Sequence, residues 1–298
     1  MKIPGGLTLA EILPPAQERG YGVPAFSTRY RACIRPAVEA ALELRSPIVV
    51  EISQRELGWF QLTPREFRDE LERVVRDLKV DVPFALHLDH SWDLAVIESA
   101  IAAGFTSVMI DASSKPFADN VADTREVVAL AHGHQVSVEA ELGRLTTTDK
   151  MESEYDEELY TDPAEAAAFV GETGCDALAV SVGTAHGAYP VKDPRIDFAR
   201  LGEIRRQIGS TPLVLHGGSG LPVATVHRAL SLAGGGISKM NIATDLEHAL
   251  LAALGGAERM TSRELDALDP EALRRGLAAV KEVAADKIRN FVCSAGRA

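Results

Sequence analysis

The chain has 298 residues and a formal net charge of −12, with 46% hydrophobic and 25% charged residues. A chain of this length and ordinary globular composition can bury a large core without disulfides. The acidic balance and the lack of a basic cluster argue against nucleic acid or an anionic membrane as a partner. An anionic substrate would therefore need local hydrogen-bond donors, because the overall charge opposes its approach.

The cysteines and the lengths of the apolar runs indicate in which cellular compartment the protein works. The three cysteines, Cys33, Cys175 and Cys293, form no Cys-x-x-Cys pair, so we expect free thiols in a reducing cytoplasm. The first residues, MKIPGGLTLAEIL, lack the apolar core and cleavage site of a signal peptide. No apolar run approaches the ~18 residues of a membrane span. The sequence predicts a cytoplasmic protein that does not associate with membranes.

Eight short apolar runs alternate along the chain with longer amphipathic segments. The runs are too short for buried helices and rich in β-branched and aliphatic residues, so they are predicted to be strands. Their mean spacing of roughly 30 residues is that of one βα unit, which favours an α/β fold closed as a (β/α)₈ TIM barrel. An open doubly wound sheet is the alternative. The predicted strands are 22–26, 47–52, 83–88, 106–110, 135–142, 176–182, 212–216 and 236–241.

Two segments depart from this pattern within what we predict to be a single domain, residues 1–298. Residues 143–161 are polar and acidic and follow the fifth strand, where a long loop is often a lid. Residues 255–298 are predicted to form an additional helical tail with charged faces. The tail could be a helical hairpin, a subunit contact or both.

Three histidines lie where predicted strands end. TIM-barrel chemistry takes place at the carboxyl ends of the strands, and His90, His186 and His216 follow the third, sixth and seventh of them. Neutral imidazole is a common zinc ligand, and three protein ligands with an open position are typical of a catalytic site. A single histidine at a strand end is more often a hydrogen-bonded or surface residue. Three at the same end favour a metal site.

Asp89 lies between His87 and His90 at the end of the third strand. Alternate residues of a strand share a face, so His87 and Asp89 should point the same way. His90 can turn toward the metal only where the strand is ending. Asp89 would then lie close to a bound substrate and could exchange a proton with it. The alternative is that Asp89 caps the helix predicted to begin near 91–92.

Glycines and short polar residues after the seventh and eighth strands predict an anion site. Backbone N–H groups in a glycine-rich turn and at a helix N-terminus bind phosphate, and TIM barrels often place a phosphate there. Each glycine cluster alone is usually only a turn. The candidate phosphate-binding residues are Gly187, Gly217, Gly218, Gly220, Ser219, Asn241 and Thr244.

Five motifs follow one another along the chain: HLDH (87–90), VEAELG (138–143), GTAHGAY (183–189), LHGGSG (215–220) and KMNIATD (239–245). In order and spacing they are similar to motifs of the class II fructose-bisphosphate and tagatose-bisphosphate aldolases. The resemblance runs from residues 23–26 to the C-terminal helix near 273–276 and so covers most of the chain. It implies a divergent member of this family, a lyase of carbohydrate metabolism.

The resemblance implies roles for the residues that match these motifs. His90, His186 and His216 would ligate Zn²⁺, or another divalent metal, and Glu141 would lie beside it as an alternative ligand or an outer partner. Asp89 would be the acid/base at the hydroxyl on the carbon that becomes the aldehyde. Zinc as a Lewis acid would stabilise the enediolate of dihydroxyacetone phosphate or a similar donor, without a Schiff-base lysine.

Further roles concern the substrate and the assembly. The predicted phosphate residues would hold the phosphate of a small phosphorylated sugar, with a monovalent cation, Na⁺ or K⁺, nearby. Ser53 matches a serine that contacts substrate. Arg274 matches an arginine that reaches the distal phosphate from a neighbouring subunit. The oligomeric states that are usual in this family, together with the helical tail, suggest a homodimer or a homotetramer.

Three segments depart from the family pattern. The loop after the fifth strand usually carries Gly-Gly and then a glutamate that protonates the enediolate, whereas here Thr146-Thr147 precede Asp149, with Glu152 or Glu154 as substitutes. Residues 27–29 (STR) replace a segment that usually has asparagine after Pro-Ala-Phe. Residues 54–56 (QRE) replace small residues after Ser53. These changes favour a substrate other than fructose 1,6-bisphosphate.

Other functions remain open at this point. A metal-dependent isomerase or epimerase would use the same enediolate without cleaving a C–C bond. A metal hydrolase barrel usually has a His-x-His pair on its first strand, and residues 23–28 contain no histidine. A non-catalytic metal- or phosphate-binding relative is suggested by the altered loop.

Overall fold

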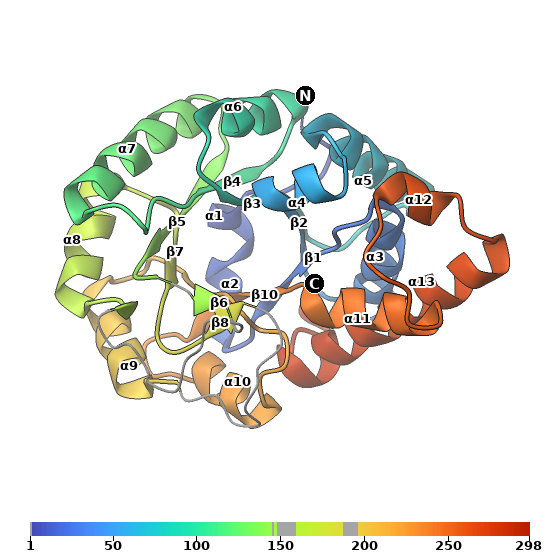
Figure 1. Ribbon diagram of the computed structural model, residues 1–298. Helices are drawn as coiled ribbons and strands as arrows, with labels where there is room; N and C mark the ends of the chain where they lie inside the picture. Colours follow the sequence, from blue (N-terminus) through green and yellow to red (C-terminus); the bar gives the residue numbers. More distant parts are fainter. Residues whose placement is uncertain (1, 145, 148–158, 187–195) are drawn as a thin grey trace.

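The computed structural model describes residues 2–144, 146–147, 159–186 and 196–298. Eight parallel strands close into a barrel in the order β1-β10-β9-β7-β5-β4-β3-β2, and helices form a ring around it (Figure 1). This confirms the predicted (β/α)₈ barrel and excludes the open sheet. The barrel strands are β1 (Val23–Ser27), β2 (Ile48–Ser53), β3 (Phe84–Ser91), β4 (Ser107–Ile110), β5 (Ser137–Leu142), β7 (Ala177–Val180), β9 (Leu213–Leu215) and β10 (Ile237–Ile242).

Each predicted strand matches one barrel strand. Two further short strands, β6 (Thr146–Thr147) and β8 (Ala185–His186), pair with each other outside the barrel. In the described parts of the chain, no helix has the length and apolar character needed to cross a membrane. The helices are α1 (Leu9–Ile12), α2 (Pro14–Arg19), α3 (Ile34–Glu43), α4 (Gln54–Trp59), α5 (Pro64–Leu78), α6 (Leu94–Ala103), α7 (Phe117–Gly133), α8 (Pro163–Thr173), α9 (Phe198–Gln207), α10 (Val223–Leu230), α11 (Thr244–Ala253), α12 (Ser262–Asp266) and α13 (Pro270–Asp286).

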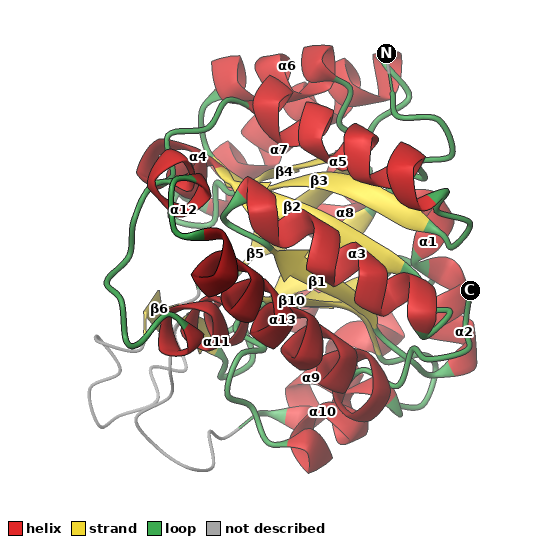
Figure 2. Cartoon of the chain, turned by 90° about the vertical axis from the view of Figure 1, so that its right-hand side faces the viewer, coloured by secondary structure: helices red, strands yellow, loops and turns green. Residues whose placement is uncertain are grey.

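The predicted helical tail contains α12 and α13, followed by a π-helical turn at Lys287–Phe291. Helix α13 packs against α3 and α11 on the outside of the barrel (Figures 1 and 2). Gly276 is the point of close approach, since a Cβ there would lie 2.8 Å from Cδ1 of Leu250 on α11. The tail is therefore part of the helical ring that covers β1 and β10.

Helices α1 and α2 close the amino-terminal end of the barrel, opposite the carboxyl ends of the strands (Figure 2). Leu9, Ile12 and Leu13 are buried there in one apolar cluster with barrel residues such as Ala85 and Val214. The sequence analysis assigned no element to these residues. Small side chains from the strands leave room for these helical residues. The interior is therefore apolar and closed at the amino-terminal end of the barrel.

The upper half of the barrel interior is charged. Because alternate residues of a strand share a face, β3 directs Ala85, His87 and Asp89 inward in succession. Ala85 belongs to the apolar cluster, whereas His87 and Asp89 meet charged side chains from other strands. The interior thus changes from apolar to ionic toward the ends of the strands, where the predicted chemistry lies.

Gly236, just before β10, provides a test of the packing. A Cβ at this position would lie 2.2 Å from the carbonyl oxygen of Leu230 and 2.3 Å from that of Ala229. Backbone atoms cannot move aside cheaply, so Gly236→Ala should lower the free energy of unfolding by about 3 kcal/mol in urea titrations. Gly202→Ala is the control, because Gly202 lies in helix α9 with open space at its Cβ. It should stabilise by roughly 0.5–1 kcal/mol.

Candidate active site

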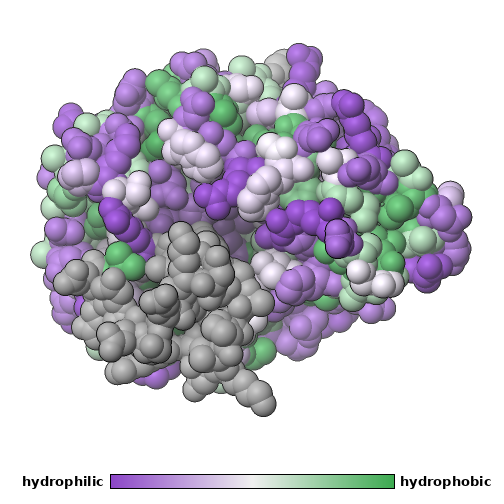
Figure 3. Space-filling model, in the orientation of Figure 1, coloured by the Kyte–Doolittle hydropathy of each residue, from purple (hydrophilic) through white to green (hydrophobic). Residues whose placement is uncertain are grey.

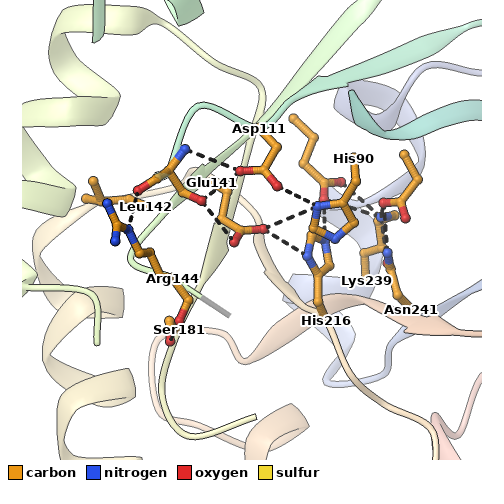
Figure 4. A network of polar contacts seen from close by, with 12 residues as sticks. His90, Asp111, Glu141, Leu142, Arg144, Ser181, His216, Lys239 and Asn241 are labelled. Carbon is orange, nitrogen blue, oxygen red and sulfur yellow. Dashed lines mark hydrogen bonds and ion pairs between the residues drawn. The ribbon is translucent and has the colours of Figure 1, made fainter. Parts of the chain in front are cut away.

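A cluster of charged and polar side chains lies at the mouth of the barrel, where β3, β4, β5, β9 and β10 end. Figure 4 shows this cluster from close by. Figure 3 views the same face of the molecule as Figure 1, and much of this face is hydrophilic. Strands supply the cluster, so its members are held by the most rigid part of the fold.

A bulge in β3 brings His90 into this cluster. Leu88 pairs with Val108, and Ser91 pairs with Ile110. Between these two pairs β3 advances by three residues and β4 by two, so β3 contains one extra residue. His90 has a φ of 26°, in the positive region that side chains rarely adopt. The expectation that the strand ends here is wrong, because β3 continues to Ser91. The extra residue turns His90 toward the barrel mouth.

His90 and His216 face each other, with ring centroids 4.4 Å apart. His90 Nδ1 is 2.9 Å from Oδ2 of Asp111, which follows β4. His216 bridges two carboxylates of β5, with Nδ1 3.1 Å from Glu141 and Nε2 2.8 Å from Glu139. Two imidazoles from opposite sides of the barrel therefore converge beside a row of carboxylates (Figure 4).

This donor set fits a divalent metal ion. Ligand atoms of Asp89, His90 and His216 lie within 4.8 Å of one another, and so do those of His90, Asp111 and Glu141. Imidazole nitrogen and carboxylate oxygen are donors that zinc and similar divalent metals accept. Asp111 also accepts hydrogen bonds from the Ser113 side chain and backbone, at 2.7 and 3.2 Å, which fix its orientation. Such outer partners are typical of metal sites.

The charges of the cluster favour protonated histidines in the metal-free chain. Burial alone would lower the pKa of His90, but Asp89 and the hydrogen bond to Asp111 raise it to about 10. Burial and the charge of His90 oppose protonation of His216, yet its bonds to Glu139 and Glu141 raise the pKa to about 9. Both imidazoles would have to lose a proton to bind a metal ion.

Asp89 is an ionised carboxylate at the centre of the mouth. Burial acts to raise its pKa, but the charges of His90 and Lys239 hold the pKa well below its usual range. Asn241 donates from Nδ2 to Asp89 Oδ1 at 2.9 Å. Asp89 does not cap a helix. Helix α6 begins five residues later, at Leu94, and its N-cap is Asp93, whose side chain accepts from the backbone of Ala95.

Lys239 of β10 lies deeper in the barrel interior than Asn241 and is fully buried. Its ammonium is 3.1 Å from Glu51 and 3.1 Å from Glu139. Burial disfavours the charge, but the two carboxylates outweigh it and raise the pKa of Lys239. A lysine held protonated cannot attack a carbonyl as a neutral amine, so it is unsuited to Schiff-base chemistry. Burial and Lys239 lower the pKa of neighbouring His87 to about 3.

The predicted phosphate residues lie beside the mouth, with several donors already used. Gly218 donates its backbone N–H to the carbonyl of Asn241 at 3.0 Å. Ser219 Oγ accepts from the backbone of Ala243 and Asp245 at the start of α11, which leaves its hydroxyl proton for another acceptor. Gly217 is buried with a φ of 70°, and Thr244 is the first residue of α11. Their phosphate contacts, and that of Asn241, stay predictions.

Two of the segments that depart from the family pattern meet in one buried network. Glu56 of α4 accepts from Ser27 Oγ at 2.6 Å and from Arg29 Nε at 2.8 Å. It also accepts from the backbone of Ser53, whose hydroxyl in turn caps α4. Arg29 is held from its other side by Glu247 of α11. The changes at 27–29 and 54–56 therefore form a single unit around Ser53.

Glu56→Ala should lower the free energy of unfolding by about 3 kcal/mol, because it leaves Arg29 buried with one partner fewer. Glu66→Ala is the matched control. Glu66 occupies the same capping-box position of α5 but is only partly buried, so its replacement should cost about 1 kcal/mol. Urea titrations of both variants give the comparison. Equal losses would mean that the buried ion pair contributes nothing.

Some predicted site residues are not among the described members of the cluster. His186 ends β8, and its side chain lies outside the described residues, as do Gly187 and Asp149. Arg274 lies on the exposed part of α13 and pairs with Glu271 of the same helix. Within one subunit it takes no part in the cluster, so its proposed contact would need a neighbouring chain.

Sequence reasoning missed three members of the cluster. Asp111 directly follows the predicted fourth strand, and the rule applied to the histidines would have found it. Glu139 and Lys239 lie inside predicted strands at a spacing of two from Glu141 and Asn241. That spacing indicates a shared face and would have suggested their place in the barrel interior.

Comparison with known proteins agrees with this geometry. Residues 7–297 match the family model described as fructose-bisphosphate aldolase class-II. The YdjI aldolase from Escherichia coli K12 is 31% identical, with 98% of this chain and 99% of that chain covered and a TM-score of 0.82. A putative fructose-1,6-biphosphate aldolase from Coccidioides immitis is 25% identical over 96% of both chains, with a TM-score of 0.76.

A more distant structure shares the fold. The fructose-bisphosphate aldolase (Fba) from Campylobacter jejuni is 21% identical, with 96% of this chain and 94% of that chain covered and a TM-score of 0.76. The family model covers nearly the whole sequence. The chain therefore belongs to the class II fructose-bisphosphate aldolase family.

Proposed function

We propose that the chain is a zinc-dependent aldolase that cleaves or forms a ketose phosphate through the enediolate of dihydroxyacetone phosphate or a similar donor. The observation that carries the proposal is the convergence of His90, His216 and the ionised Asp89 at the mouth of a class II aldolase barrel. A purely structural protein would have no need for an ionised carboxylate held beside two buried histidines in this way.

The described residues that would hold the metal are His90 and His216, with Glu141 beside them. The proposed third histidine is His186, whose side chain lies outside the described residues. When bound, the metal would act as a Lewis acid that stabilises negative charge on the substrate oxygen beside the breaking bond. Asp111 and Glu139 would orient the imidazoles from their other nitrogens.

Asp89 would accept the proton of the aldol hydroxyl during cleavage and return it during condensation. Its bond to Asn241 fixes the carboxylate, so one oxygen is directed to Asn241 and the other is left for substrate. Protonation of the donor carbon is assigned to Asp149, which lies outside the described residues.

The substrate and the assembly follow from the same proposal. Ser219, Thr244 and the Gly217–Gly218 turn would hold the phosphate of a small sugar, with Na⁺ or K⁺ nearby. The unit of Ser27, Arg29 and Glu56 around Ser53 supports an aldehyde half other than that of fructose 1,6-bisphosphate. A homodimer or homotetramer would let Arg274 reach a neighbouring site.

Zinc content and exchange of the α-proton of dihydroxyacetone phosphate in deuterated water test the proposal, because exchange needs no knowledge of the aldehyde. The wild-type protein should bind about one zinc per chain and exchange the proton, and His90→Ala should lose both. His132→Ala is the control, because His132 pairs with Asp176 on the outer surface.

Two outcomes would favour other functions. Exchange without an aldehyde product from any ketose phosphate would indicate an isomerase or epimerase. Bound zinc with no exchange on dihydroxyacetone phosphate or close analogues would indicate a non-catalytic metal- or phosphate-binding relative.

A further inference from the structure

The interior lysine has a role in the active site that charge balance alone does not describe. Lys239 lies two residues before Asn241 on β10, and both side chains point into the barrel. Its ammonium lies 2.7 Å from Asn241 Oδ1, in addition to its ion pairs with Glu51 and Glu139. Asn241 Nδ2 in turn donates to Asp89. A continuous chain of hydrogen bonds therefore leads from Lys239 through Asn241 to Asp89. Figure 4 shows Lys239 beside Asn241.

An asparagine amide has two ends of nearly equal shape, one a donor and the other an acceptor. If the amide were turned over, its oxygen would face the carboxylate of Asp89, and two acceptors would repel each other. An ammonium can only donate, so it binds the amide oxygen and rejects the NH₂ group. Lys239 therefore selects the rotamer in which Asn241 presents a donor to Asp89.

The surroundings make this selection strict. The ammonium donates to Asn241 Oδ1 at 2.7 Å and to Glu139 Oε1 at 3.4 Å and forms an ion pair with Glu51. Asp89 Oδ1 is farther away, at 4.0 Å. The lysine and both glutamates have no exposed surface, so water does not replace a missing partner. A methyl group at the same place would remove the contact that holds the amide oxygen and leave only Asp89 to orient the amide.

We infer that Lys239 is a positioning residue that orients Asn241 and, through it, the carboxylate of Asp89 in the C–C bond-making and bond-breaking step. This inference rests on the proposed function, because it concerns how the proposed acid/base is held. It assigns to Lys239 no contact with substrate and no exchange of protons.

The test separates orientation from charge balance. Lys239→Met removes both the donor and a charge, so the double variant Lys239→Met with Glu51→Gln, which removes both members of the ion pair, is compared with the wild type. Glu51→Gln alone shows what loss of the carboxylate does by itself. The double variant should keep its melting temperature, zinc content and KM within a factor of about three. Its kcat for ketose phosphate cleavage should fall about 10²-fold, the usual effect of a catalytic group misplaced by about 1 Å.

Two results would overturn the inference. The first is a double variant with the kcat of the wild type, which would reduce Lys239 to charge balance. The second is a full additional loss of kcat when Lys239→Met is added to Asn241→Leu, because a residue that acts through Asn241 should lose its effect once Asn241 is gone.

A crystal structure of the double variant gives a readout that does not depend on activity. The contact between Asn241 and Asp89 should be broken or lengthened. An intact 2.9 Å contact would contradict the inference even if the wild-type protein catalysed another reaction. Failure of wild-type proton exchange, in contrast, would speak against the proposed aldolase function.

Discussion

Asp89→Asn should lower the rate of C–C bond cleavage by about 10³-fold while leaving most of the α-proton exchange on dihydroxyacetone phosphate. Removal of a general acid/base typically lowers a rate 10²–10⁴-fold. Asp89 is assigned to the aldol hydroxyl, whereas exchange at the donor carbon is assigned to another group. The two reactions should therefore separate in this variant. Cleavage is measured as release of dihydroxyacetone phosphate from the ketose phosphate that the wild type accepts.

Asp93→Asn is the matched control for this prediction. It makes the same chemical change four residues later, at the N-cap of α6, where asparagine caps as well as aspartate does. Its activity should equal that of the wild type. If Asp89→Asn instead lost zinc and both reactions together, Asp89 would be a metal ligand, in agreement with its distance from His90 and His216.

Metal binding should release protons and become tighter as the pH rises from 6 to 9. In the metal-free chain, the carboxylates raise the pKa of His90 to about 10 and that of His216 to about 9. A raised pKa means that the fold stabilises the protonated form, so protons compete with the metal at neutral pH. Below pH 9 the affinity should therefore rise up to about 100-fold per pH unit, with release of up to about two protons.

Calorimetry in two buffers of different ionisation enthalpy measures the protons released. His216→Ala should abolish or greatly weaken zinc binding, and any residual binding should release about one proton fewer. A zinc affinity that does not change between pH 7 and pH 9 would contradict the prediction, because it would mean that both imidazoles are already neutral in the metal-free chain.

Much of the fold follows from periodicity and spacing, because barrel strands are buried on both faces and separated by helices of regular length. The same reasoning found His90 and His216, since strand ends in a closed barrel meet at one mouth. It did not find the bulge at His90. An added residue in one strand is defined by pairing with its neighbour, and neither Asp89-His90-Ser91 nor the pattern around it shows that pairing.

The spacing of Glu139 and Lys239 indicates that they point inward, but the pairing of the interior charges was outside the reach of sequence reasoning. Lys239, Glu51 and Glu139 come from strands that are far apart along the chain, and their contacts appear only when the barrel closes. Taken singly, each of these charged residues only interrupts the apolar pattern of its strand and indicates no partner. Asn241 was predicted from its place at a strand end, but its amide orientation depends on Lys239 below it.

The bulge in β3 affects how precisely Asp89 and His90 are placed relative to each other. Successive residues of a regular strand point to opposite faces, yet here Asp89 and His90 both reach the mouth. The proposed proton acceptor and a proposed metal ligand are therefore joined by a single peptide bond. Thermal motion of the surrounding loops would move both together and would hardly change the distance between them. This part of the site is held at fixed separation by covalent geometry, whereas His216 and Glu141 depend on the barrel remaining closed.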